Sequence, residues 1–131
     1  MRRFVVIETP YFTPALKEVA RNVRYARACV RDSLLRGEIP FASHLIYTQP
    51  GITNDKLPKE RKLGIMTGMA INKKLNATAI IYTDLGISGG MKLGIKMAKR
   101  HGRKIEYRRL GKGWEKKFSK QEHKHPYRAI W

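Results

Sequence analysis

Short apolar runs alternate with longer amphipathic segments along most of this chain, and this alternation constrains its fold more than any other feature. Residues 4–7 and 77–83 are continuous apolar runs rich in β-branched side chains, which is typical of strands buried on both faces. Residues 40–47 form a similar run, entered through a proline, and we expect a strand there. Residues 104–108 are more polar and predict a strand at the edge of a sheet.

Three segments between these runs have the length and the apolar spacing of helices, namely residues 15–36, 58–75 and 88–101. In the second segment Leu63, Met66 and Ala70 form an apolar stripe, which we expect to face the core. Gly64 and Gly68 lie one helical turn apart and predict close packing of this helix against a neighbour.

The order of the elements is therefore β-α-β-α-β-α-β. It predicts an α/β fold, a Rossmann-like three-layer sandwich with a short, mostly parallel sheet and helices on both faces. We expect residues 1–110 to form this domain and residues 111–131 to form a basic tail that packs back on it through aromatic side chains. The aromatic residues of this tail are Trp114, Phe118, Tyr127 and Trp131.

The chain is strongly basic, with 28 Lys and Arg against 10 Asp and Glu and a formal net charge of +18. Such a field attracts phosphate-bearing partners and speeds their encounter with the protein. Free nucleotides, nucleic acids and acidic proteins all fit it. Binding of nucleic acid through the basic tail is therefore one of our functional hypotheses.

Other features argue against several classes of protein. Cys29 is the single cysteine, so the chain forms no internal disulfide, and His101, His123 and His125 lack the spacing of a metal site. We predict neither a metal nor a cofactor. The chain has no apolar run long enough to span a membrane, and the N-terminal run is too short for a signal peptide. We expect a cytoplasmic protein.

Ligands of parallel α/β sheets bind at the carboxyl ends of the strands, near a switch in strand order. Polar residues collect at the predicted strand ends, and we expect them to converge there on one site. Glu8 and Asp84 are the candidate catalytic residues, because a carboxylate at a strand end binds sugar hydroxyls or acts as nucleophile or acid. The predicted ligand-binding residues are Glu8, Thr9, Tyr11, Arg21, Ser43, His44, Tyr47, Asp84, Gly86, Ser88 and Gly89.

Residues 86–90 carry three glycines and a serine between a strand and a helix. Glycines let the backbone approach a ligand closely, and a helix N-terminus offers free N–H groups, so this loop predicts a phosphate cradle. Arg21, near the start of the first helix, is placed to reach a phosphate. The long loop of residues 48–58 is also of a kind that often carries function.

Four segments, residues 8–11, 21–29, 40–51 and 82–91, together resemble a family of small, uncharacterised proteins common in phages and prophages. The resemblance covers about residues 3–110, and that family is distantly similar to nucleoside 2-deoxyribosyltransferases. It implies a Rossmann-like fold with a nucleoside-shaped site at the strand ends.

In the transferases a Ser-Gly loop leads into a helix that carries the nucleophilic glutamate. Ser88 and Gly89 match the loop, but Lys92 stands nearest to the position of the glutamate. A lysine cannot replace a carboxylate that attacks an anomeric carbon. The resemblance therefore supports nucleotide binding, and N-glycosidase or deoxyribosyltransferase activity on nucleoside monophosphates is the alternative, with Glu8 or Asp84 as the carboxylate.

In the leading hypothesis Glu8 and Asp84 hold sugar hydroxyls or a base edge, the loop of residues 86–90 holds phosphate, and Tyr11 or Tyr47 stacks on the base. If the chain is phage-encoded, this predicts sequestration of a nucleotide signal of host defence in the host cytoplasm. Because relatives of this fold often build sites between subunits, we also expect a homo-oligomer.

Overall fold

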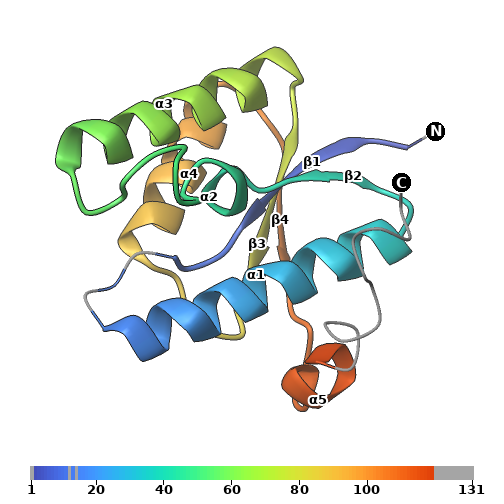
Figure 1. The fold of residues 1–131 in the computed structure, drawn as a ribbon. Helices are drawn as coiled ribbons and strands as arrows, with labels where there is room; N and C mark the ends of the chain where they lie inside the picture. Colours follow the sequence, from blue (N-terminus) through green and yellow to red (C-terminus); the bar gives the residue numbers. More distant parts are fainter. Residues whose placement is uncertain (1, 12, 14, 120–131) are drawn as a thin grey trace, which may run out of the picture.

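The computed structural model describes residues 2–11, 13 and 15–119 and confirms the α/β fold (Figure 1). Its four strands form one sheet in the order β2-β1-β3-β4, and every neighbouring pair is parallel. The strands are β1 (Phe4–Glu8), β2 (Ile39–Phe41), β3 (Thr78–Tyr82) and β4 (Ile105–Arg108). The polar strand β4 lies at an edge, as its sequence predicts.

The first strand of the chain lies inside the sheet. Val6 pairs with Phe41 of β2 on one side and with Ala79 of β3 on the other. The chain moves from β1 outward to β2 and then returns past β1 to β3, so the strand order switches between β1 and β3. A parallel sheet has its ligand site at such a point, outside the carboxyl ends of the strands.

Helices cover both faces of the sheet (Figure 1). Helix α1 (Leu16–Leu35) packs on one face, where Tyr25 and Cys29 are fully buried against Ile7 and Ile80. Helix α4 (Gly89–Arg100) packs on the other face through Met91 and Ala98. Helix α3 (Pro58–Lys74) contacts α4. None of the helices in the described part of the chain is long and apolar enough to cross a membrane.

The prediction of a strand over residues 40–47 is wrong in its second half. β2 ends at Phe41, and a short helix α2 (Ser43–Ile46) follows it. A run of this length and apolarity does not distinguish a strand from a buried helical turn. The predicted ligand-binding residues Ser43, His44 and Tyr47 therefore belong to a short helix and its C-cap rather than to a strand end.

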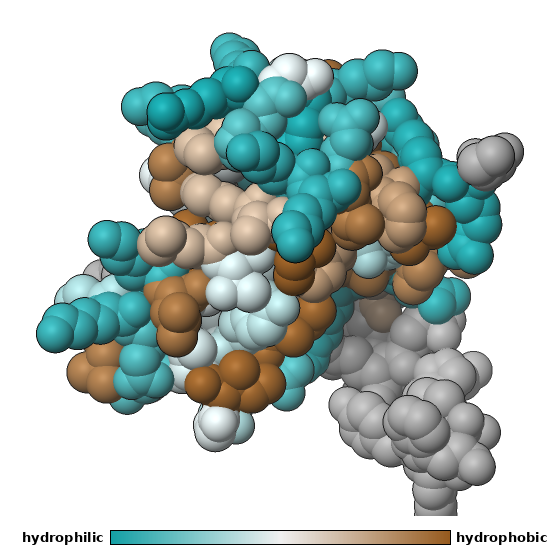
Figure 2. Space-filling model, turned by 90° about the horizontal axis from the view of Figure 1, so that it is seen from above, coloured by the Kyte–Doolittle hydropathy of each residue, from teal (hydrophilic) through white to brown (hydrophobic). Residues whose placement is uncertain are grey.

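Helix α3 packs on α2 through its two glycines, as predicted. A Cβ added at Gly68 would lie 2.7 Å from Cβ of Ser43, and one added at Gly64 would lie 3.5 Å from Cβ of Tyr47. The predicted inward stripe of α3 instead faces outward, with Leu63 62% and Met66 57% exposed. Figure 2, viewed from the side of α3, shows apolar side chains gathered on this surface and hydrophilic ones around them. The close approach of two backbones, rather than burial of large side chains, determines which face of α3 turns inward.

The segment after β4 returns to the domain. Asp84 accepts hydrogen bonds at 2.9 Å from the backbone N–H groups of Leu110 and Gly111. Helix α5 (Trp114–Ser119) follows, and the Trp114 ring packs edge-on against Tyr25 with their centroids 5.1 Å apart. This confirms the predicted packing of Trp114. Of the other aromatic residues predicted to pack on the domain, Phe118 lies in α5, and Tyr127 and Trp131 lie outside the described residues.

Candidate functional site

A cavity of about 240 Å³ lies at the carboxyl edge of the sheet, beside the switch between β1 and β3. Its walls come from the end of β1, from α2, from the loop that follows α2, and from α3 and α4. The volume is somewhat below the range of about 300–1,000 Å³ typical of drug-sized ligands. It therefore suits a small ligand, of about the size of a nucleoside, better than a dinucleotide.

Most of the predicted ligand-binding residues line this cavity. Those that do are Glu8, Thr9, Tyr11, Ser43, His44, Tyr47, Ser88 and Gly89. Those that do not are Arg21, Asp84 and Gly86. Arg21 is exposed on α1, on the other side of the sheet, and Gly86 is an exposed turn residue with a φ of +82°. The structure thus brings together the predicted residues at the end of β1, around α2 and at the start of α4, and it places Arg21, Asp84 and Gly86 elsewhere.

Asp84 lies on the opposite side of the sheet from Glu8. In the register of β1 and β3, Glu8 pairs with Ile81, and side chains alternate between the two faces along a strand. Asp84 follows Ile81 by three residues, so its side chain lies on the opposite face, towards α1. There its carboxylate accepts a hydrogen bond from the Tyr25 hydroxyl at 2.5 Å. Asp84 therefore holds the returning segment in place and is not in the site.

The Glu8 side chain is enclosed beneath α4. A Cβ added at Gly94 would overlap the Glu8 carboxylate, so glycine is required at this position for the side chain to take its place. Burial raises the pKa of Glu8 to about 7, although attraction to Arg103 opposes this increase. Near neutral pH this carboxyl group therefore exchanges readily between its protonated and its ionised form.

His44 also lines the cavity and is held by two neighbours. Its Nε2 forms a hydrogen bond of 2.8 Å with Oγ1 of Thr9. The Tyr11 ring packs edge-on against the imidazole, with ring centroids 5.8 Å apart. Burial lowers the pKa of His44 to about 4, so the imidazole is neutral at physiological pH. A neutral imidazole can both donate and accept a hydrogen bond.

Sequence reasoning missed several polar residues of the cavity, above all Asp55, Asn72 and Arg103. Each has a buried atom without a hydrogen-bond partner among the described residues: Oδ2 of Asp55, Oδ1 of Asn72 and Nε of Arg103. Burial raises the pKa of Asp55 and lowers the pKa of Arg103. Asp55 belongs to the long loop that the sequence marks as functional, whereas Asn72 and Arg103 have no local signal.

The start of α4 forms another part of the wall. Ser88 is the N-cap of α4, and its Oγ accepts a hydrogen bond from the Met91 backbone N–H at 3.3 Å. Gly89 and Gly90 also line the cavity, and their N–H groups lie in the first turn, where a helix supplies no carbonyl partner. This wall combines free donors with the positive end of the helix dipole, which favours an anion.

Fold and cavity together define a Rossmann-like α/β protein with a small polar site at the switch point of its sheet. Residues 3–108 match the model of a family described as a domain of unknown function, DUF7768. The chain belongs to this family, and the match includes all four strands. No curated protein and no solved structure matches the chain.

Proposed function

We propose that this protein binds a nucleotide-type ligand, of the size of a nucleoside monophosphate, in the cavity at the switch point. The observation that carries the proposal is the polar lining of the cavity, in which Asp55, Asn72 and Arg103 each have a buried atom without a hydrogen-bond partner among the described residues. Leaving such an atom unsatisfied costs about 1–3 kcal/mol. A ligand with both donors and acceptors removes this cost when these side chains turn towards it on binding, and an apolar ligand does not.

The distribution of charge orients this ligand. The phosphate lies at the start of α4, where the N–H groups of Gly89 and Gly90 and the helix dipole favour an anion. The base or sugar then faces Asn72 and Arg103, which offer one acceptor and one donor. The Tyr11 and Tyr47 rings line the cavity as surfaces for base stacking.

A second function, cleavage of an N-glycosidic bond, is favoured by Glu8. Its carboxyl group is enclosed in the cavity with a pKa of about 7, which is suited to proton transfer at neutral pH. In hydrolysis the bond from the sugar to the base breaks and water adds to the anomeric carbon. Glu8 gives its proton to the leaving base, and Asp55, the other acidic residue of the lining, accepts the proton of the water.

A thermal-shift titration with nucleosides and nucleoside monophosphates tests both functions when free base is also measured by chromatography. A ligand at about one hundred times its Kd stabilises the native state by about 2.7 kcal/mol, or about 10 °C for a domain of this size. We expect monophosphates to give such a shift. An absence of shift with every one of these compounds would contradict the proposal.

Two variants locate the binding. Asn72→Leu removes an unpartnered acceptor from the cavity, so we expect the affinity to fall about tenfold or more. Asp84→Asn is the matched control, because Asp84 lies on the other face of the sheet, and we expect a lower melting temperature but an unchanged ligand shift. Base release that disappears in Glu8→Gln while the shift persists would support the enzyme.

A further inference from the structure

The outer face of α1 carries a row of basic side chains that has no role in the cavity. This arginine face consists of Lys17, Arg21, Arg24, Arg27 and Arg31. Arg24 and Arg31 are seven residues apart, which places them on one line along the helix and about 10.5 Å apart. In the described part of the chain, Arg21, Arg24 and Arg31 have no ion-pair partner.

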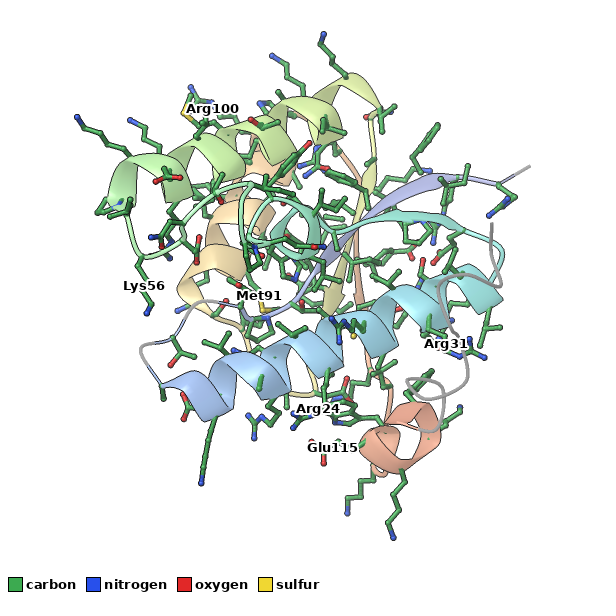
Figure 3. The ribbon with its side chains drawn as sticks, viewed as in Figure 1. Arg24, Arg31, Lys56, Met91, Arg100 and Glu115 are labelled. Atoms are coloured by element: carbon green, nitrogen blue, oxygen red, sulfur yellow. The ribbon has the colours of Figure 1, made fainter. Side chains whose placement is uncertain are left out.

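Helix α5 extends this basic surface. It packs against α1, where Ala28 is only 3% exposed, and Lys112, Lys116 and Lys117 are exposed on it or just before it. Figure 3 shows Arg24 and Arg31 on the side of the molecule where α5 and Glu115 lie, away from Arg100. Glu115 is the only acidic residue of this α5 segment. The two helices are therefore in contact, and both carry exposed basic side chains.

The kind of basic residue differs between α1 and the helices on the other face of the sheet. Helix α1 has four arginines and one lysine, whereas α3 and α4 carry mainly lysines. Those lysines are Lys59, Lys62, Lys73, Lys74, Lys92, Lys96 and Lys99. Arginine binds phosphate through two parallel N–H groups, while lysine acts as a point charge. Charge for solubility alone does not require arginine on one helix and lysine on the others.

We propose that the arginine face binds the phosphate backbone of nucleic acid. The residues of the arginine face do not line the cavity at the switch point and are spread along one side of a helix, so they suit the repeated phosphates of a polymer better than a single small ligand. Contacts to phosphate position a protein on nucleic acid without reading its sequence. This binding is therefore independent of base sequence. It is separate from the proposed nucleotide site, which lies on the other side of the sheet.

Fluorescence anisotropy with a labelled 20-nucleotide single strand and a 20-base-pair duplex tests this surface on the full chain. The test variant is Arg21→Gln/Arg24→Gln/Arg31→Gln, and the control is Lys62→Gln/Lys73→Gln/Lys74→Gln on α3. Both variants lose three charges. For duplex DNA each lost phosphate contact lowers the slope of log K against log salt by about 0.9, so we expect the test variant to lose about 2.7 units of slope. At 0.1 M salt this corresponds to roughly 500-fold weaker binding.

The control should bind nearly as well as the wild type. An equal loss in both variants would mean that net charge alone drives binding, and no loss in the test variant would place binding elsewhere; either result overturns the proposal. Equal competition by polyglutamate of the same charge would assign the surface to an acidic protein instead. The increase in melting temperature with nucleoside monophosphates should be the same in the test variant as in the wild type. A failure of the nucleic-acid proposal can therefore be distinguished from a failure of the proposed nucleotide site.

Discussion

Glu8 and His44 share one cavity, and burial favours the uncharged form of both. It raises the pKa of the Glu8 carboxyl to about 7 and lowers the pKa of the His44 imidazole to about 4. Between these values the cavity holds a protonated carboxyl and a neutral imidazole, within a chain whose formal net charge is +18. If a phosphate binds at the start of α4, as proposed above, it meets no negative charge on Glu8 below neutral pH.

Replacing Glu8 by glutamine should change how stability depends on pH. The folded pKa of Glu8, about 7, lies above its ordinary value of 4.5, so its contribution to stability is fully present below pH 4.5 and is lost as pH rises through 7. Glu8→Gln does not titrate, so relative to the wild type it should gain up to about 3 kcal/mol between pH 5 and pH 8. Urea unfolding at both pH values measures this difference. Parallel stability profiles for the two proteins would show that Glu8 titrates as an exposed carboxyl.

At the scale of elements, the contact between α2 and α3 depends more on Gly68 than on Gly64. A Cβ at Gly68 would lie 2.7 Å from both Cβ and Oγ of Ser43, so Gly68→Ala must push the two helices apart. We expect it to destabilise the protein by about 1–3 kcal/mol. It should also weaken ligand binding, because both helices line the cavity.

Gly64→Ala is the matched control on the same helix. Its Cβ would make an ordinary contact at 3.5 Å with Tyr47, and alanine is the better helix former by up to about 1 kcal/mol. We expect no loss of stability. Denaturant midpoints of the two variants give the comparison, and equal losses would mean that the packing at Gly68 is not the cause.

The sequence is sufficient to predict the elements whose periodicity is long, such as α1, α3 and α4, and the two strands with continuous apolar runs. It fails at residues 40–47, because a strand of three residues followed by one helical turn has no period of its own. Only part of the site can be predicted from the sequence. Strand ends can be located from sequence, whereas Asn72 and Arg103 reach the cavity only through the way α3 and the segment after α4 pack.

At the scale of the whole molecule, one carboxylate joins distant parts of the chain. Glu38 accepts hydrogen bonds from Ser33 of α1, from Arg3 just before β1, and from Arg108 at the end of β4. Glu38 is only 6% exposed. The hydrogen bonds from Arg108, followed by those from Arg3 and Ser33, hold its pKa at about 2. The network therefore connects the last strand to the first strand and to the helix that covers them.

Glu38→Gln should reveal how much of the acid stability depends on this network. Because the folded pKa lies below the ordinary value of 4.5, the contribution is present above pH 4.5 and is lost as pH falls towards 2. We expect the variant to be roughly 2–3 kcal/mol less stable than the wild type at pH 7, with the difference shrinking below pH 4.5. Thermal or urea unfolding between pH 2 and pH 7 measures it. A difference that does not change with pH would mean that the loss comes from packing alone.

The central position of β1 has a consequence for the growing chain. β1 is made first, but its second neighbour β3 begins only at Thr78, so one edge of the apolar segment Val5–Ile7 stays open while some seventy further residues are synthesised. An open apolar edge is a template for pairing with another chain. The growing chain is therefore open to pairing with other chains until β3 has been made, and a slow stretch of translation before residue 78 would lengthen that period.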